Sequence, residues 1–192
     1  LVYLSRNKKV QEFKEYDDVN QTQLTMLCNF NGINDYERKY VLPVYGEILG
    51  GSSNSILFDT VREKNSYAYY VNALVKPYDN VMMIYSGIQK GNDKEVIKLI
   101  EKSLVGISKG KFDVDKMESA KKTLISAIES SLDNPISIIN NYYAKVLVDA
   151  LDVEEKIEKI KKVSREDIIN VSKKISVHTL FLLEASDEEN ND

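Results

Sequence analysis

The chain has 192 residues, of which 43% are hydrophobic and 29% charged, proportions typical of one ordinary globular domain. Its formal net charge of −4 argues against a nucleic-acid partner, because phosphate binding requires concentrated Lys and Arg. No run approaches the roughly 20 apolar residues that span a bilayer, and no signal peptide is recognisable, so we expect no membrane partner.

The single cysteine, Cys28, lies in an apolar run. It has no internal disulfide partner, so we expect a buried free thiol in a reducing compartment and hence a cytoplasmic location. Residues 1–9, with the polar run Ser5-Arg6-Asn7-Lys8-Lys9, predict a linker, 10–184 a single domain, and the acidic segment 185–192 a disordered tail.

The first half of the chain alternates strand and helix patterns. Residues 8–17 and 20–30 read as strands separated by the turn Asp17-Asp18. In the second strand, one face carries Leu24, Met26, Cys28 and Phe30. A helical stripe then runs from Tyr36 to Gly50-Gly51, and Pro43 within it predicts a kink or a late helix start near Leu42.

The remaining elements follow in order. We expect a short helix over 54–64, strands over 68–75 and 81–88, helices over 92–109, 114–132 and 134–150, two shorter helices, and a closing strand over 178–184. Capping boxes are predicted for the pairs Asn92/Glu95, Asp152/Glu155 and Ser164/Asp167. This order favours an α+β domain, an antiparallel sheet with helices packed on one face.

Several kinds of site are absent from the sequence pattern. Gly50-Gly51 follows a helix and precedes no Lys-Ser or Lys-Thr pair, so we interpret it as a helix C-cap, not as a phosphate loop. The only histidine, His178, lies in an apolar strand, and no H-x-x-E-H helix exists, so no metal ligands are predicted. Glu47, Asp59 and Glu63 form no pattern that favours acid–base chemistry over ordinary exposed charges.

Arg62 and the tyrosines after it leave two interpretations open. Arg62 falls in the last turn of its helix, where a cation can simply complement the helix dipole. Alternatively, Arg62 and one tyrosine project into a cleft and donate hydrogen bonds to a peptide carbonyl. Alternation places Tyr67, Tyr69 and Val71 on one strand face, and it does not decide which tyrosine is exposed.

The stretch "LGGSSNSILFDTVREKNSYAYYV", residues 49–71, resembles the LGGGxSSRLFxxVREKxGLAYxV signature in the C-terminal half of pitrilysin- or insulinase-type zinc peptidases. "NQTQLTMLCNF", "DVDKMESAKKTLISAIESSLDNP" and "VSREDIINVSKKI" are similar to further landmarks of that half, in the same order, so the resemblance covers about residues 10–184. It departs from the signature at Ile56, which replaces an arginine, and at Asn65-Ser66-Tyr67, which replaces x-Gly-Leu.

The resemblance implies one half of a clamshell whose zinc, on H-x-x-E-H, belongs to an N-terminal half or partner subunit. It assigns substrate binding to Arg62 and Tyr69, which occupy the matching motif positions seven residues apart, and it makes the chain inactive by itself. The implied partners are the zinc-bearing half, a peptide substrate and, in some arrangements, a second copy. The alternative is a non-catalytic scaffold subunit of the same superfamily.

Overall fold

The computed structural model describes residues 9–148 and 152–185; apart from Lys9 and Ala185, the expected linker and tail lie outside these ranges. The strands are β1 (Gln11–Asp17), β2 (Thr22–Phe30), β3 (Ala68–Lys76), β4 (Val81–Ile88) and β5 (Ile175–Ala185). The helices are η1 (Glu37–Val41), α1 (Leu42–Gly46), η2 (Glu47–Gly51), η3 (Phe58–Glu63), α2 (Asp93–Ser108), α3 (Val114–Ser131), α4 (Pro135–Val148), α5 (Val153–Lys162) and α6 (Arg165–Ser172).

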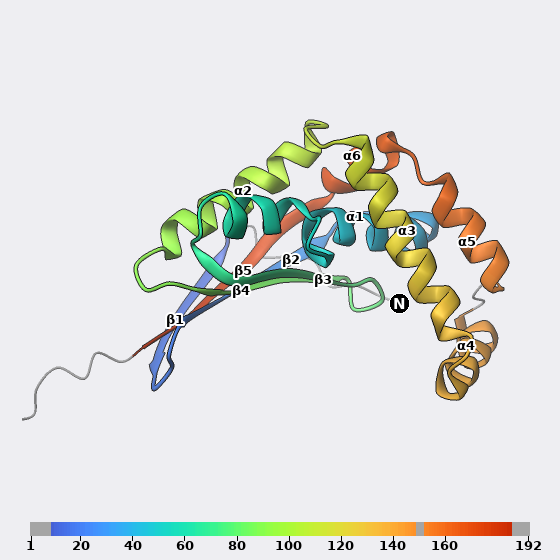
Figure 1. The fold of residues 1–192 in the computed structure, drawn as a ribbon, viewed down its shortest axis with the longest axis horizontal. Coiled ribbons are helices and arrows are strands. Elements are labelled where there is room, and N and C mark those ends of the chain that lie inside the picture. Colours follow the sequence, from blue (N-terminus) through green and yellow to red (C-terminus); the bar gives the residue numbers. More distant parts are fainter. Residues whose placement is uncertain (1–8, 149–151, 186–192) are drawn as a thin grey trace, which may run out of the picture.

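The five strands form one sheet in the order β1-β5-β2-β4-β3, with helices layered on one face (Figure 1). The predicted α+β class is confirmed, but the sheet is mixed, because β5 is parallel to β1 and antiparallel to β2. The closing strand inserts between the first two strands, which run in opposite directions. A strand in that place must be parallel to one of its neighbours, which strand patterns alone do not reveal.

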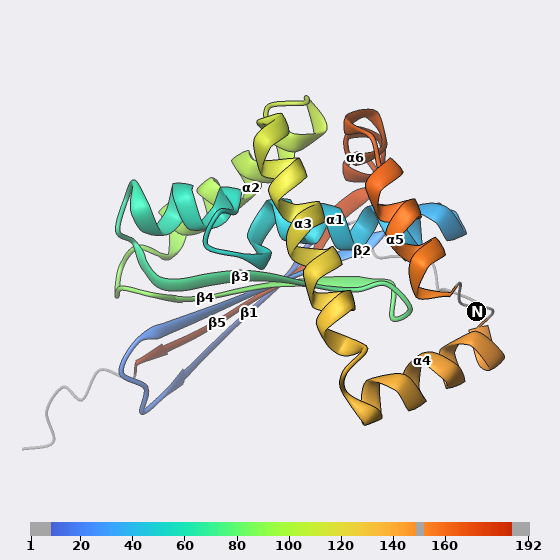
Figure 2. The same ribbon diagram turned by 45° about the vertical axis from the view of Figure 1, so that its right-hand side comes forward.

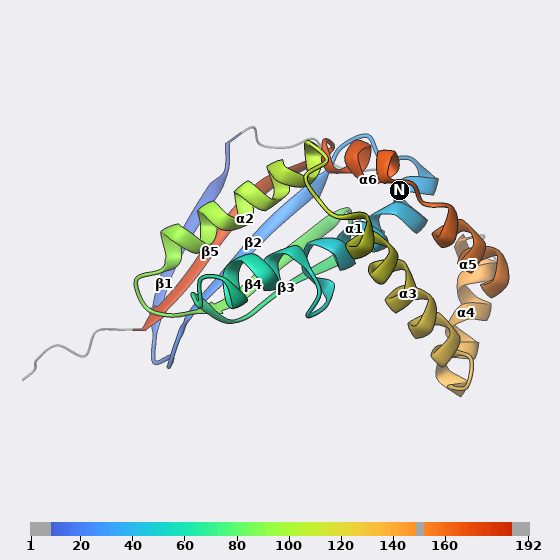
Figure 3. The same cartoon turned by 45° about the horizontal axis from the view of Figure 1, so that its top comes forward.

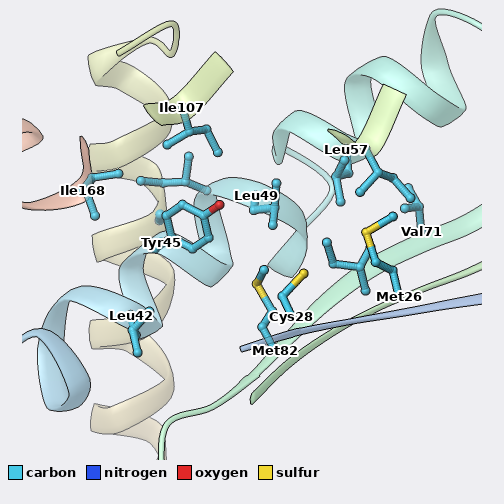
Figure 4. Close-up of a cluster of buried hydrophobic side chains, with 14 of the residues drawn as sticks. Met26, Cys28, Leu42, Tyr45, Leu49, Leu57, Val71, Met82, Ile107 and Ile168 are labelled. Carbon is cyan, nitrogen blue, oxygen red and sulfur yellow. The ribbon is translucent and has the colours of Figure 1, made fainter. Parts of the chain in front are cut away.

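The core lies between the sheet and the helices, as the close-up in Figure 4 shows. The predicted alternation in β2 is confirmed: Leu24, Met26, Cys28 and Phe30 are all buried. Cys28 is a free thiol within this core, and burial raises its pKa to about 12. The thiol therefore stays protonated at neutral pH, as the expectation of an inert, buried cysteine requires.

The helix that contains Pro43 is continuous from Asp35, so the expected late start near Leu42 is wrong. Just before the proline, the Leu42 N–H donates to the Glu37 carbonyl five residues back, a π-type turn. In a regular α-helix the proline ring would collide with the carbonyl four residues earlier, and the wider turn relieves this contact. The helix begins with an unpredicted capping box between Asn34 and Glu37, whose two side chain–backbone bonds are each 2.8 Å long.

The three predicted capping boxes fare differently. Ser164 and Asp167 form theirs at the start of α6, with bonds of 3.1 and 2.8 Å. Asn92 makes no side-chain cap bond at α2, and Asp152 instead binds Lys145 at 2.6 Å. The helices themselves are present, so the sequence pattern located these helix starts correctly even where the bonds differ.

Candidate functional site

The Gly-Ser segment passes very close to strand β3. A Cβ atom on Gly50 would lie 2.7 Å from the Ala73 backbone nitrogen and 2.8 Å from its Cβ. The helix ends at Gly50-Gly51 as expected, but Gly50 has an extended φ of −159° and neither glycine has a positive φ. Gly50 is needed for backbone approach, and the contact fixes where the chain turns toward η3.

Helix η3 and the residues just before it place Arg62 at the surface. Leu57 and Val61 are fully buried, whereas Arg62, at the C-terminal end of η3, is exposed. Its guanidinium carbon lies 4.8 Å from the centre of the Phe58 ring. This cation–π contact holds the side chain without using its N–H groups. Among the described residues, the Arg62 guanidinium donates no hydrogen bond to a helix carbonyl.

A C-cap turn with a left-handed residue, the αL motif, joins η3 to strand β3. The Ser66 N–H donates to the Arg62 carbonyl at 2.9 Å, and the Tyr67 N–H donates to the Val61 carbonyl at 3.1 Å. Ser66 adopts a φ of +54°, the left-handed conformation, at the position where the resembled signature has glycine. The loss of glycine therefore leaves the turn intact and places a serine in a conformation that glycine adopts at lower cost.

Replacing Ser66 by glycine is expected to stabilise the domain by about 0.5–1 kcal/mol, because the steric cost of a left-handed serine is removed. Urea unfolding followed by circular dichroism measures the change. Ser52→Gly is the matched control, since Ser52 has a φ of −147° and gains nothing from glycine. An equal effect of the two changes would contradict strain at Ser66.

A β-bulge exposes Tyr69. In the β3–β4 ladder Ala68 pairs with Ile88 and Tyr70 with Gly87, which leaves Tyr69 as the extra residue. Tyr69 is 61% exposed, whereas Val71 is buried, so the expected strict alternation across Tyr67, Tyr69 and Val71 is wrong at this point. Bulges of this kind re-aim a side chain and are common beside functional sites.

The other two tyrosines of the motif pack against the protein. Tyr67 is half-buried against the core, and the Tyr70 ring lies 6.2 Å from the ring of Tyr85. Within this strand start, Tyr69 is thus the tyrosine that presents its side chain to solvent. Arg62 and Tyr69 sit on adjoining elements, η3 and the first residues of β3, joined by the turn at Ser66.

The acidic residues near this region do not form a cluster. Asp59 pairs with Lys116 at 2.6 Å, and Glu63 is exposed. Glu47 is half-buried, one of its carboxylate oxygens has no hydrogen-bond partner, and burial raises its pKa. Across residues 9–148 and 152–185, no group of three or more His, Cys, Asp and Glu side chains is arranged to hold a metal ion.

His178 contributes no site of its own. It is half-buried in β5 at an irregularity in the pairing with β2, and its Nδ1 lies 2.7 Å from the Thr179 hydroxyl. No helix within the described ranges is long and apolar enough to cross a membrane.

Two hollows occur elsewhere on the surface. One, of about 770 Å³, lies among η1, α3, α4 and α5, and the other, of about 480 Å³, lies beside η3 and the turn before α3. Neither is lined by Arg62 or Tyr69. Both side chains are exposed in the described structure.

Comparison with known proteins places this geometry in a family. Residues 3–124 match the family model described as the peptidase M16 inactive domain. A Bacillus subtilis (strain 168) protein named "Probable inactive metalloprotease YmfF" is 26% identical over an alignment of 185 residues, and the match covers 94% of this chain and 43% of that protein.

Two solved structures share the fold. A conserved protein from Enterococcus faecalis V583 superposes with a TM-score of 0.91 at 28% identity, over 97% of this chain and 44% of that one. A putative zinc protease from Bordetella pertussis Tohama I superposes with a TM-score of 0.64 at 14% identity, over 82% of this chain and 93% of that one.

The chain spans less than half the length of the Bacillus and Enterococcus proteins, whereas the Bordetella chain consists almost wholly of this fold. The inactive-domain model covers well over half of the 192 residues and includes the Gly-Ser segment, η3 and the start of β3. This chain belongs to the peptidase M16 inactive-domain family.

Proposed function

We propose that this chain is the non-zinc half of an M16-type metallopeptidase and that Arg62 and Tyr69 bind the carbonyl of the peptide bond to be cut. The observation that carries the proposal is the state of these two side chains. Both are exposed, both sit on elements fixed by the same turn, and the Arg62 donors are unused within the described residues.

The chemistry follows from the donors. A guanidinium and a phenol both donate hydrogen bonds to oxygen. When a nucleophile attacks a peptide carbonyl, negative charge develops on its oxygen, and donors already in position stabilise that charge more than the neutral carbonyl. In this scheme Arg62 and Tyr69 orient the peptide and hold the oxygen as its charge grows.

In this proposal zinc lies in the other half of the peptidase and not in this chain. No residue group described here suits a metal, and the Bordetella relative is named a putative zinc protease. When bound in its own half, zinc would supply an activated water as the nucleophile. This chain contributes the peptide contacts.

The test is reconstitution. We expect this chain alone to leave a library of fluorogenic peptides uncut, and the natural protein or complex that contains it to cut at least one member, with the cleavage lost on zinc chelation. The chain alone serves as the control for contaminating peptidases. Hydrolysis by the purified chain, or none by the complete assembly, would reject the proposal.

The second candidate is a non-catalytic subunit of the same family. The name of the Bacillus relative, which describes a metalloprotease as inactive, favours it. In that case Arg62 and Tyr69 carry no substrate, and the complete assembly with its partner lacks peptidase activity while remaining stably associated. The same reconstitution therefore separates the two candidates.

A further inference from the structure

Helix α4 is the least covered helix of the described structure. It follows α3 and lies beyond the end of that helix, apart from the helices layered on the sheet (Figures 2 and 3). None of the side chains from 135 to 147 is buried. The helix carries a single charged residue, Lys145, which is already paired with Asp152 at 2.6 Å.

Seven large apolar side chains of α4 are exposed, and five of them share one side of the helix, with Ile138 and Tyr142 beside that side. Ile136, Ile139, Tyr143, Val146 and Leu147 recur in steps of three and four, and each is 55–75% exposed. This spacing forms a stripe of the kind that packs into a groove or against another helix. We call these five residues the α4 stripe.

The stripe points away from this domain. The opposite side of the helix carries Ser137, Asn141 and Ala144; Ser137 and Ala144 are half-buried, and Asn141 and Ala144 line the cavity of about 770 Å³. Tyr142 and Lys145 line the same cavity and none of the five stripe residues does, so the α4 stripe lies toward solvent. This is the reverse of what a helix does when its domain is its only partner.

Other exposed helices of this protein look different. On α5, charged residues fill the solvent side, including Lys159, Lys161 and Lys162. An uncharged stripe of this size on α4 therefore marks a surface that another structure covers.

We propose that the α4 stripe is the docking surface for the other half of the M16 polypeptide or complex. The Bacillus and Enterococcus relatives each contain more than a further chain's length outside the matched region, and the Enterococcus match extends over 97% of this chain, so α4 belongs to the shared part. The inference rests on the proposed function only in requiring that a second half exists.

The size of the stripe argues against a second copy of this chain as the occupant. A 14-residue helix is about 21 Å long, and one side of it presents roughly 400 Å². A standard stable interface buries about 800 Å² on each partner. A half that is covalently linked does not need the full area, because the link raises its effective concentration, and a separate second copy has no such link.

The experiment compares α4 in this chain and in the whole natural protein by hydrogen–deuterium exchange. The Bordetella chain shows that the fold occurs almost by itself, so the 192-residue chain is a valid reference. We expect amides 136–147 to exchange at least about tenfold more slowly in the whole protein. Equal exchange in both would overturn the proposal.

A pair of variants tests the stripe itself. Tyr143→Glu combined with Leu147→Glu is expected to raise α4 exchange in the whole protein to the level of the isolated chain. Asn141→Glu adds a charge to the opposite side of the same helix and is expected to leave the protection unchanged, and circular dichroism checks that all variants fold. If Asn141→Glu removes the protection equally, the stripe is not the contact.

Analytical ultracentrifugation of the isolated chain tests whether the α4 stripe binds a second copy. A concentration-dependent dimer that the double variant abolishes would assign the stripe to a second copy and reject the other half as its occupant. Because no arm of this experiment measures turnover, a failure here leaves the carbonyl-binding role of Arg62 and Tyr69 to its own test. Loss of that role likewise leaves the docking result standing.

Discussion

Replacing Arg62 by alanine is expected to lower kcat of the reconstituted peptidase by about 10²–10³, the usual effect of removing one oxyanion-type donor. Tyr69→Phe, which removes only the phenolic hydroxyl, is expected to act in the same direction. Both residues are exposed, and Arg62 rests on Phe58 without a hydrogen bond, so neither change breaks a described contact of the core. The loss should fall on kcat more than on KM, because the charge on oxygen exists in the transition state.

Two neighbouring changes serve as matched controls. Lys64→Ala removes the same charge two residues later, and Tyr70→Phe removes the same hydroxyl from the adjacent residue, which packs beside Tyr85. We expect both to leave kcat within about twofold, because charge and hydroxyl matter only where they reach the carbonyl. Arg62→Lys is expected to recover part of the rate, since it keeps the charge and loses the planar fork. Unchanged turnover in Arg62→Ala and Tyr69→Phe would reject the carbonyl-binding role and leave the non-catalytic subunit as the remaining candidate.

Gly50→Ala is expected to destabilise the domain by about 2 kcal/mol, because the added methyl group meets backbone and not a movable side chain. The new Cβ would lie 2.7 Å from the Ala73 nitrogen, so η2 or β3 has to shift. In a domain of this size the melting temperature should fall by about 4–8 °C. Differential scanning calorimetry measures both quantities.

Gly106→Ala is the matched control for Gly50. Gly106 lies inside α2, and its added Cβ would meet nothing nearer than the Lys111 Cβ at 4.0 Å. There alanine is expected to stabilise by about 0.5–1 kcal/mol, because it has the higher helix propensity. Opposite signs at the two glycines would confirm that backbone approach at β3, and not glycine flexibility, explains Gly50. A loss at both positions would contradict it.

The local patterns of the sequence predicted most elements because they depend on neighbours in the chain. Alternating apolar residues located β2 with its buried face, and the helical pattern over 114–132 located α3. The Asn34/Glu37 capping box has the same residue spacing as Ser164/Asp167, so the sequence alone also contains the signal for it. The motif around Arg62 pointed to the family, whose inactive-domain model matches residues 3–124.

Other features depended on contacts between distant segments. Insertion of β5 between β1 and β2 made the sheet mixed. The bulge opposite Gly87 broke the alternation that grouped Tyr69 with Val71. The demand for glycine at position 50 comes from Ala73, which lies in a strand that the sequence pattern does not place beside it.

By itself, the sequence determined the α+β class and the buried Cys28, because periodicity is a property of neighbouring residues. The resemblance to the peptidase signature paired Arg62 with Tyr69 as candidates. Only the tertiary structure decided that Tyr69 is the exposed tyrosine, that Ser66 takes the left-handed turn of a glycine, and that α4 turns its apolar stripe outward. Exposure depends on which segments pack together across the fold, and that is settled by long-range contacts.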